Sequence, residues 1–340
     1  MSQPKVSIAI LNWNGKSWLE KFLPFVQKSS YPNHEIIVID NASTDDSIPF
    51  LKENYPEAKL LVWADNYGFA EGYNKLIEHV DAPYVILLNS DVEVPEGWIE
   101  PLVERMESDK ELISVQPKIL AHYKKTLFEY AGACGGYMDY FAYPFCRGRI
   151  FDTVEEDTGQ HDSFQEVFWA TGACCMLRTE YVKKIGLFQP EFFAHMEEID
   201  FCWRAKNFGY KVGCEPASQV YHVGGGALPP SSPFKTYLNV RNSLAAMLLN
   251  LPASQLVPKI FARLCLDGVW SVKALLGGDV KGVFSVLKAH VHFYQKVPFW
   301  LKRRKEIYKA YKPIQQRIGY HPKSVIWQYF IRGKKEFGQL

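Results

Sequence analysis

Short apolar runs alternate with helical patterns along the first 120 residues, and this alternation constrains the fold more than any other feature. Each intervening helix carries the chain back across the sheet, so successive strands run parallel. The pattern predicts a doubly wound, mostly parallel α/β sheet. We place strands at residues 5–13, 34–41, 58–65, 83–94 and 112–120, and helices at 15–29, 45–55, 71–80 and 97–107.

The alternation then lapses. Residues 123–168 are rich in glycine and aromatic residues and show no period, so we expect a long loop that is functional or mobile. Beyond it we expect a strand at 166–178, a helix at 179–186 capped by Thr179, a helix from Met196 that Gly209 ends, a strand at 210–222 and a helix at 234–250. The last of these opens a helical C-terminal extension.

Charge is distributed unevenly along the chain. The chain from Lys259 onward contains 17 Lys and Arg and 4 Asp and Glu, a net charge of +13, whereas the preceding part carries −11. We therefore predict two regions with different surfaces, 1–250 and a basic helical region at 251–340. Helical spacing there puts Val283, Val286, Leu287 and Val291 on one stripe and Lys281, Ser285, Lys288 and His292 on the other, followed by basic residues at 302–305.

This basic region resembles an anchor that lies on a membrane, although a dimer surface or a helical cap fits equally well. No apolar segment reaches the roughly 18 to 20 residues that a spanning helix needs. The seven cysteines lack metal or disulfide spacing, and the N-terminus reads as a strand, not a secretory signal. We expect a cytoplasmic protein, peripheral on the inner face of the cell membrane, that binds no nucleic acid.

An acidic segment lies in an otherwise apolar run at 192–204. If a helix begins there, Glu197, Asp200 and Arg204 share one face. Asp200 and Arg204 would then form an i, i+4 ion pair with a structural role, contributing roughly 0.2 to 0.5 kcal/mol.

Glu198 points to a different face of this helix, which it shares with Phe201, Cys202 and Ala205. Such an apolar wall raises the pKa of a carboxylate toward the range that suits a general base. Glu198 is therefore the base candidate, and stabilisation of the helix N-terminus is the alternative role.

Polar residues also follow the predicted parallel strands, whose carboxyl ends share one sheet edge where ligands bind. Asp91 after the fourth strand could hold Mg²⁺ or Mn²⁺, and Asp40 after the second lies on the same edge; either acid could instead simply form a turn or cap. In residues 65–74, glycines and a helix N-terminus with free amides suit a diphosphate, or form a plain turn. His222 precedes a glycine triplet that could close as a lid.

Two nucleotide-binding classes are disfavoured. The first strand-to-helix turn, "NWNGKS", has one glycine where a dinucleotide fingerprint needs three, and no GxxxxGK[ST] phosphate loop occurs.

The order of these segments resembles the inverting glycosyltransferases of family 2, with the GT-A fold, particularly the rhamnosyltransferase-like branch. The matching segments are "VSIAILNWNG", "EIIVIDNASTDDS", "DNYGFAEGYN", "VILLNSDVEV", "FWATGACCMLR", "GLFQPEFFAHMEEIDFCWR", "VYHVGGG" and "YLNVRNSL". They span about the first 250 residues. Two positions depart from the family pattern: Asn89 replaces the first acid of a DxD motif, and Glu198 stands where Asp is commoner.

The resemblance implies a role for each matching residue. Glu198 would be the catalytic base, and Asp91 and His222 would hold Mg²⁺ or Mn²⁺. The donor would be bound by Asn12, Asp40, Asn66, Gly68, Ala70, Asn74, Arg241 and Asn242, and the acceptor side would include Trp169, Thr171 and Glu197.

The implied reaction moves a sugar from dTDP-rhamnose or a UDP-hexose to a hydroxyl of a glycan or lipid-linked saccharide, in cell-surface polysaccharide synthesis. The region from Tyr123 to Phe168 would form the acceptor wall. A non-catalytic sugar-nucleotide-binding subunit of an assembly complex is the alternative. A nucleotidyltransferase is disfavoured because its glycine-rich loop after the first strand is absent.

Overall fold

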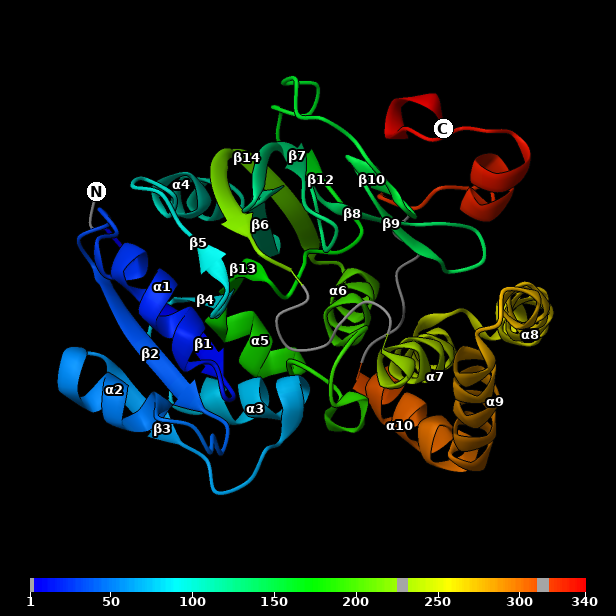
Figure 1. The fold of residues 1–340 in the computed structure, drawn as a ribbon, viewed down its shortest axis with the longest axis horizontal. Coiled ribbons are helices and arrows are strands. Elements are labelled where there is room, and N and C mark those ends of the chain that lie inside the picture. Colours follow the sequence, from blue (N-terminus) through cyan, green and yellow to red (C-terminus); the bar gives the residue numbers. More distant parts are fainter. Residues whose placement is uncertain (1–2, 225–231, 311–317) are drawn as a thin grey trace.

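The computed structural model describes residues 3–224, 232–310 and 318–340 and forms an α/β fold around one large mixed sheet (Figure 1). The strand order is β12-β14-β6-β13-β4-β1-β2-β3, with β5 paired to β14 and β7 to β6. The strands of this sheet are β1 (Val6–Asn12), β2 (His34–Asp40), β3 (Lys59–Val62), β4 (Tyr84–Asn89), β5 (Val92–Glu93), β6 (Leu112–Ala121), β7 (Lys124–Phe128), β12 (Gln165–Glu166), β13 (Cys174–Arg178) and β14 (Lys211–His222).

Helices cover both faces of this sheet, which explains why the central strands are apolar along their whole length. Side chains of β1 alternate between two cores: Ile8 and Ile10 pack with α1, α2 and α4, whereas Ala9 packs with α3 and α6. The N-terminal helices are α1 (Lys16–Gln27), α2 (Ser47–Asn54), α3 (Gly68–Ile77), α4 (Glu100–Ser108), α5 (Thr179–Ile185) and α6 (Glu197–Asn207).

The predicted fold class is confirmed, but three local predictions are wrong. The strand expected at 166–178 is interrupted: β12 ends at Glu166, and β13 starts at Cys174 and runs antiparallel to β4 and β6. Thr179 is the first residue of α5, not its cap, and its hydroxyl makes no hydrogen bond within the described residues.

The third error is the loop expected at 123–168. This region contains β7 and a separate antiparallel sheet of order β11-β10-β9-β8, formed by β8 (Gly136–Met138), β9 (Pro144–Cys146), β10 (Arg149–Ile150) and β11 (Thr153–Val154). Strands of two or three residues are too short to show a period of two. C-terminal residues pack on this sheet, because Met138 N donates to Gly319 O at 3.0 Å and Val325 joins its core.

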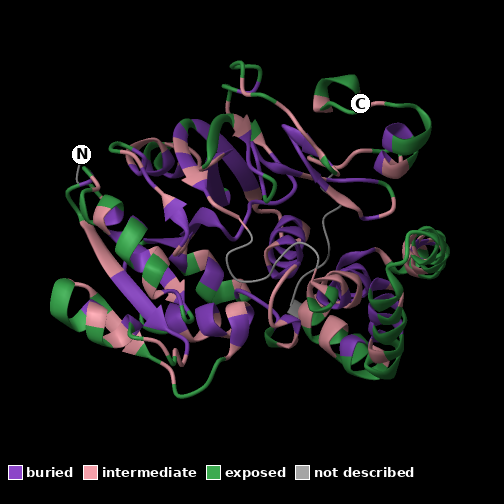
Figure 2. Ribbon diagram, viewed as in Figure 1, coloured by how far each residue is buried: buried purple, intermediate pink, exposed green. Residues whose placement is uncertain are grey.

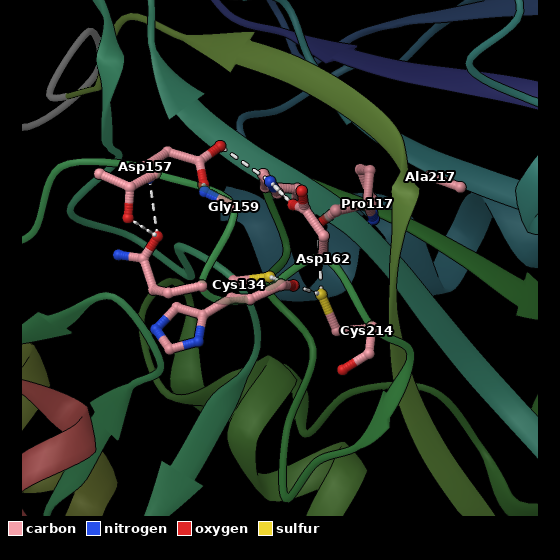
Figure 3. Close-up of polar contacts among 12 residues, drawn as sticks. Pro117, Cys134, Asp157, Gly159, Asp162, Cys214 and Ala217 are labelled. Atoms are coloured by element: carbon pink, nitrogen blue, oxygen red, sulfur yellow. Dashed lines mark hydrogen bonds and ion pairs between the residues drawn. The ribbon is translucent and has the colours of Figure 1, made fainter.

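A buried lysine on β6 attaches the loop that follows the small sheet. The ammonium group of Lys118, almost fully buried, lies 2.8 Å from Asp157 Oδ2 and also contacts Asp162. Nearby, the thiols of Cys134 and Cys214 lie 3.7 Å apart (Figure 3). All seven cysteines are free thiols.

Four helices follow the glycine segment: α7 (Pro233–Asn250), α8 (Ala253–Leu276), α9 (Val280–Gln295) and α10 (Val297–Ala310). Short helical turns complete the described chain at Pro190–Phe192, Trp327–Ile331 and Phe337–Gln339. The apolar stripe predicted on α9 is partly wrong, since Val286 is buried whereas Leu287 and Val291 are exposed. Among the described residues, no helix is long and apolar enough to cross a membrane.

Asp200 and Arg204 of α6 do form the predicted i, i+4 pair, with 3.7 Å between Oδ2 and Nη2. Both side chains are buried, so the value expected for a solvated surface pair does not apply. Arg204 donates to the carbonyls of Ile185, Gly186 and Leu187, at 2.6 to 2.8 Å, and thereby joins α6 to the end of α5.

We predict that Arg204→Ala lowers the free energy of unfolding by about 3 to 5 kcal/mol, because it leaves Asp200 as a buried charge without its cation. Urea denaturation followed by tryptophan fluorescence measures this. As a control, Lys110→Ala removes an exposed pair with Glu107 and should cost under about 1 kcal/mol. Equal effects of the two substitutions would show that the buried pair does not hold α6.

Candidate active site

The carboxyl ends of β1 and β2 lie side by side, with Asn12 opposite Asp40. Both residues are fully buried. Asn12 Nδ2 donates to Asp40 Oδ2 at 3.2 Å, and the amide of Ser43 donates to Asp40 Oδ1 at 2.9 Å. The Asp40 carboxylate is thus fixed at the sheet edge, where it closes the β1–β2 end of the site.

Asp91 and His222 come together at the next part of this edge. Asp91 lies in the turn between β4 and β5, and β5 pairs with the end of β14 so that Val92 is opposite His222. His222 Nε2 lies 3.1 Å from Asp91 Oδ1. The sequence-predicted metal pair is therefore assembled in space.

Glu129, which sequence reasoning missed, lies on the other side of the imidazole, with Oε2 3.4 Å from His222 Nδ1. Burial alone would lower the pKa of His222, but hydrogen bonds and charge from Asp91 and Glu129 raise it to about 10. Glu129 belongs to the region expected to be a loop. It reaches His222 because its amide donates to Ile119 O on β6, at 3.0 Å, and β6 pairs with β14.

Glu197 and Glu198 begin α6, as predicted. Glu197 is buried and Glu198 is partly exposed, yet each has a buried Oε2 without a hydrogen-bond partner in the described chain. Burial raises the pKa of Glu198 to about 7. Burial and the neighbouring Glu198 raise the pKa of Glu197 as well.

Glu198 faces the segment that leads into β13. A Cβ built on Gly172 would lie 3.9 Å from Glu198 Cβ and 3.0 Å from the ring of Phe69. Next to Gly172, the carbonyl of Ala173 accepts a hydrogen bond from Asn89 N at 2.9 Å, at the end of β4. This contact links the Glu198 side of the site to the strand that ends just before Asp91.

The loop before α6 is strained. Three of its residues have positive φ angles, which residues other than glycine seldom adopt: 65° at Phe193, 67° at His195 and 71° at Met196. Asn242 on α7, fully buried, holds this loop: its Nδ2 contacts the carbonyls of Phe192, Ala194 and His195, at 2.9, 3.0 and 2.7 Å.

Arg241 completes this clamp instead of facing open solvent. Its Nη2 donates to the carbonyls of Glu191 and Phe192, at 2.8 and 3.1 Å, and its Nε donates to Asn242 Oδ1 at 2.9 Å. The expected role of this residue as a phosphate cation finds no support in these contacts, because most of its donors already have partners.

The amides expected to be free at the start of α3 are also occupied. Phe69 N and Ala70 N both donate to Phe193 O, at 2.7 and 3.0 Å, and Gly68 N donates to Asn66 Oδ1 at 2.9 Å. The prediction of free donors for a diphosphate is therefore wrong. Gly68 is needed here since its φ is 72° and a Cβ would meet the Phe193 ring at 2.5 Å.

The remaining residues predicted to bind donor or acceptor differ in their exposure to solvent. Asn66 is exposed, whereas Asn74 bonds both the amide and the carbonyl of Phe188. Trp169 is buried against Gly136 and donates to Tyr137 O at 3.0 Å. Thr171 is buried as well, and its hydroxyl accepts from Ala173 N at 3.2 Å. These side chains are used by the fold, and so is the oxygen of Asn66, which accepts from Gly68 N and from Asn41 Nδ2, both at 2.9 Å.

Lys235, near the start of α7, is a second residue that the sequence did not single out. Burial lowers its pKa, while the charge of Glu129 opposes that shift. Burial and the charge of Lys235 in turn lower the pKa of His195 to about 4. The charge of Lys235 is thus within electrostatic range of Glu129 and of His195. Most of the glycine triplet predicted to form a lid falls outside the described residues.

Asp91 and His222 offer a carboxylate oxygen and an imidazole nitrogen close together. This pair suits a divalent ion when the ion displaces the proton that the raised pKa keeps on His222. Glu129 on the opposite ring nitrogen resembles the outer partner that orients a ligating histidine. Over the described residues, no cluster of three or more His, Cys, Asp and Glu side chains is placed to hold a metal. The protein side of a site here would consist of two ligands.

Similarity to known proteins identifies the family of this chain. The model of the family "Glycosyl transferase family 2" matches residues 7–186. The N-acetylglucosaminyl-diphospho-decaprenol L-rhamnosyltransferase of Mycobacterium tuberculosis is 23% identical over 218 residues, which cover 60% of this chain and 71% of that protein. The low-salt glycan biosynthesis hexosyltransferase Agl10 of Haloferax volcanii is 22% identical over 249 residues, covering 71% and 75%.

Two solved structures share the fold. GalNAc-T7, solved with UDP, GalNAc and Mn²⁺, aligns with a TM-score of 0.57 and 18% identity over 73% of this chain and 48% of that one. The mannosyltransferase PcManGT of Pyrobaculum calidifontis, solved with GDP-Man and Mn²⁺, aligns with a TM-score of 0.52 and 13% identity over 87% and 89%. The chain therefore belongs to glycosyltransferase family 2, has the GT-A fold, and is an enzyme that transfers a sugar from a nucleotide sugar.

Proposed function

We propose that this enzyme is an inverting transferase that moves a rhamnosyl or hexosyl group onto a hydroxyl of a glycan or lipid-linked saccharide. The observation that carries the proposal is Glu198, a carboxylate in the first turn of α6. Its buried Oε2 has no hydrogen-bond partner within the described residues, and its Cβ lies beside Gly172, in the segment that leads into β13. Two relatives of this chain are named for a lipid-diphosphate acceptor and for glycan biosynthesis. The donor would be dTDP-rhamnose or a UDP-hexose, and the pathway cell-surface polysaccharide synthesis.

The chemistry is a single displacement. Glu198 Oε2 takes the proton of the acceptor hydroxyl as that oxygen bonds to the anomeric carbon, and the bond to the diphosphate oxygen breaks on the opposite side. A pKa of about 7 leaves Glu198 about half ionised at neutral pH and makes it basic enough to accept a proton. General base catalysis of this kind contributes roughly 10²- to 10⁴-fold.

Negative charge on the leaving diphosphate needs a cation, and Arg241 is committed to the loop before α6. We assign this role to Lys235, with Asn12, Asp40 and Asn66 on the nucleotide side. Asp91 and His222 would hold Mg²⁺ or Mn²⁺ when it is bound, and the ion would offset charge on the diphosphate. The basic C-terminal helices would bring the enzyme to the inner face of the cell membrane.

We predict that Glu198→Gln lowers the rate of sugar transfer by about 10²- to 10⁴-fold, because the amide cannot accept the proton. Donor affinity, measured by calorimetry, should stay close to that of the wild type. The exposed Glu180→Gln on α5 is the control and should transfer normally. If Glu198→Gln transfers normally and Glu197→Gln is inactive, Glu198 is not the base and the assignment is wrong. If Glu198→Gln changes donor affinity alone and leaves the rate of transfer as it was, the result would favour a non-catalytic subunit.

We also predict that Asp91→Asn abolishes most of the stimulation by Mn²⁺ and lowers kcat/KM on the order of 100-fold, because one anionic ligand is lost. The readouts are donor hydrolysis across a Mn²⁺ titration and Mn²⁺ binding by electron paramagnetic resonance in the presence of donor. Asp81→Asn, on an exposed turn, is the control. An unchanged Mn²⁺ response in Asp91→Asn would remove this residue from the metal site.

A further inference from the structure

Helix α8 has an inverted polarity. Its buried side chains are Lys259, Arg263 and Asp267, all ionisable and four residues apart, so one polar stripe faces the protein. A helix on the surface of a water-soluble protein normally buries apolar residues and exposes charged ones. The orientation of α8 therefore requires an explanation.

Specific contacts fix this orientation. Arg263 Nη2 donates to Ser243 Oγ at 3.0 Å, and its Nε lies 3.2 Å from Asp267 Oδ1. The other oxygen of Asp267 lies 3.1 Å from His290 Nε2 on α9. Rotating α8 to bury its apolar side would expose or break this network, so the apolar side must face outward.

The outward side is extensive and continues onto α9. Figure 2 shows α8 and the outer side of α9 as largely exposed, and in Figure 1 these helices lie at the edge of the molecule opposite α2 and β3. The exposed large apolar residues are Val257, Phe261, Leu264, Val269, Trp270, Val272, Leu275 and Leu276 on α8, and Val280, Phe284, Leu287, Val291 and Tyr294 on α9. We call this set the α8–α9 face.

An open groove of about 350 Å³ extends the α8–α9 face toward α10. It is lined by Leu248, Leu256, Val257, Ile260, Phe261, Leu264, Tyr294 and Leu301. Contiguous exposed apolar surface on this scale marks a contact with a membrane or a partner.

The charges around the α8–α9 face are mostly positive, although the exposed Asp279 lies beside it. Lys273, Lys281, Lys288 and Lys296 are exposed on or beside it. Of the two acids between residues 253 and 296, Asp267 is buried, and Asp279 caps α9 through Gly282 N at 2.8 Å. A second copy docked symmetrically would set these lysines against each other, since a twofold interface pairs the same patch with itself.

We propose that the α8–α9 face lies in the boundary between headgroups and acyl chains of an anionic bilayer, with α8 inserting its apolar side and the four lysines contacting lipid phosphates. An inserted apolar face with a basic rim is the arrangement by which interfacial helices bind anionic lipid. Trp270 and Tyr294 belong to the residue types that favour this boundary. The inference rests on the proposed function in one respect: a lipid-linked acceptor would be held in the membrane that this face binds.

The test is co-flotation of the intact enzyme with vesicles of phosphatidylglycerol and phosphatidylcholine, against vesicles of phosphatidylcholine alone, without donor or acceptor. The wild type should float with the anionic vesicles. The triple variant Phe261→Ser, Trp270→Ser, Leu275→Ser should lose about tenfold or more of this partitioning. Lys273→Gln, Lys281→Gln, Lys288→Gln should weaken binding to anionic vesicles and reduce its sensitivity to salt.

A matched triple elsewhere, Phe25→Ser, Val62→Ser, Tyr123→Ser, also removes three exposed apolar side chains and should float like the wild type. Cooperative thermal unfolding of each variant verifies that it is folded. Equal flotation of both triples, or no flotation of the wild type, overturns the proposal. If the wild type does not bind vesicles but is a dimer in sedimentation velocity, and the α8 triple variant is a monomer, the face binds a second copy of the chain instead. Glu198→Gln should float normally, so failure of transfer and failure of this inference are separable.

Discussion

The strained loop before α6 is the constraint on which the site depends. Three non-glycine residues with positive φ cost free energy on the order of 1 to 3 kcal/mol each, and they persist here because Asn242 and Arg241 hold the loop carbonyls. The same loop ends at Glu197, so its conformation sets the direction in which α6 begins. The position of Glu198 thus follows from contacts made by α7, about 45 residues later in the chain.

The loop also connects the two halves of the site. The carbonyl of Phe193 accepts the first amides of α3, and a Cβ at Gly68 would collide with the Phe193 ring. Helix α3 follows β3 on the side where we propose that the nucleotide binds, whereas α6 carries the proposed base. One strained segment therefore sets the spacing between them, which gives a physical reason for the Arg241–Asn242 pair other than phosphate binding.

The sequence predicts most of the N-terminal fold because its period is local: β1 to β4 and the helices between them follow from residues adjacent in the chain. It misses what depends on distant pairing. The strands β8 to β11 are too short to show a period, and Glu129 reaches His222 only through the sheet. Glu198 is identified by helical spacing and resemblance, but the occupied amides of α3 and the inverted α8 depend on partners that no local pattern encodes.

The most direct test of this account is the pH dependence of kcat/KM in the wild type and in Asn242→Ala. As the proposed base, Glu198 would act only when deprotonated, and burial raises its pKa to about 7. Activity should therefore fall about tenfold per pH unit below 7. In Asn242→Ala the loop should relax, kcat should drop, and the inflection should move toward the ordinary glutamate value of about 4.3. A variant that keeps both the inflection and the kcat of the wild type would contradict the claim that this clamp places the base.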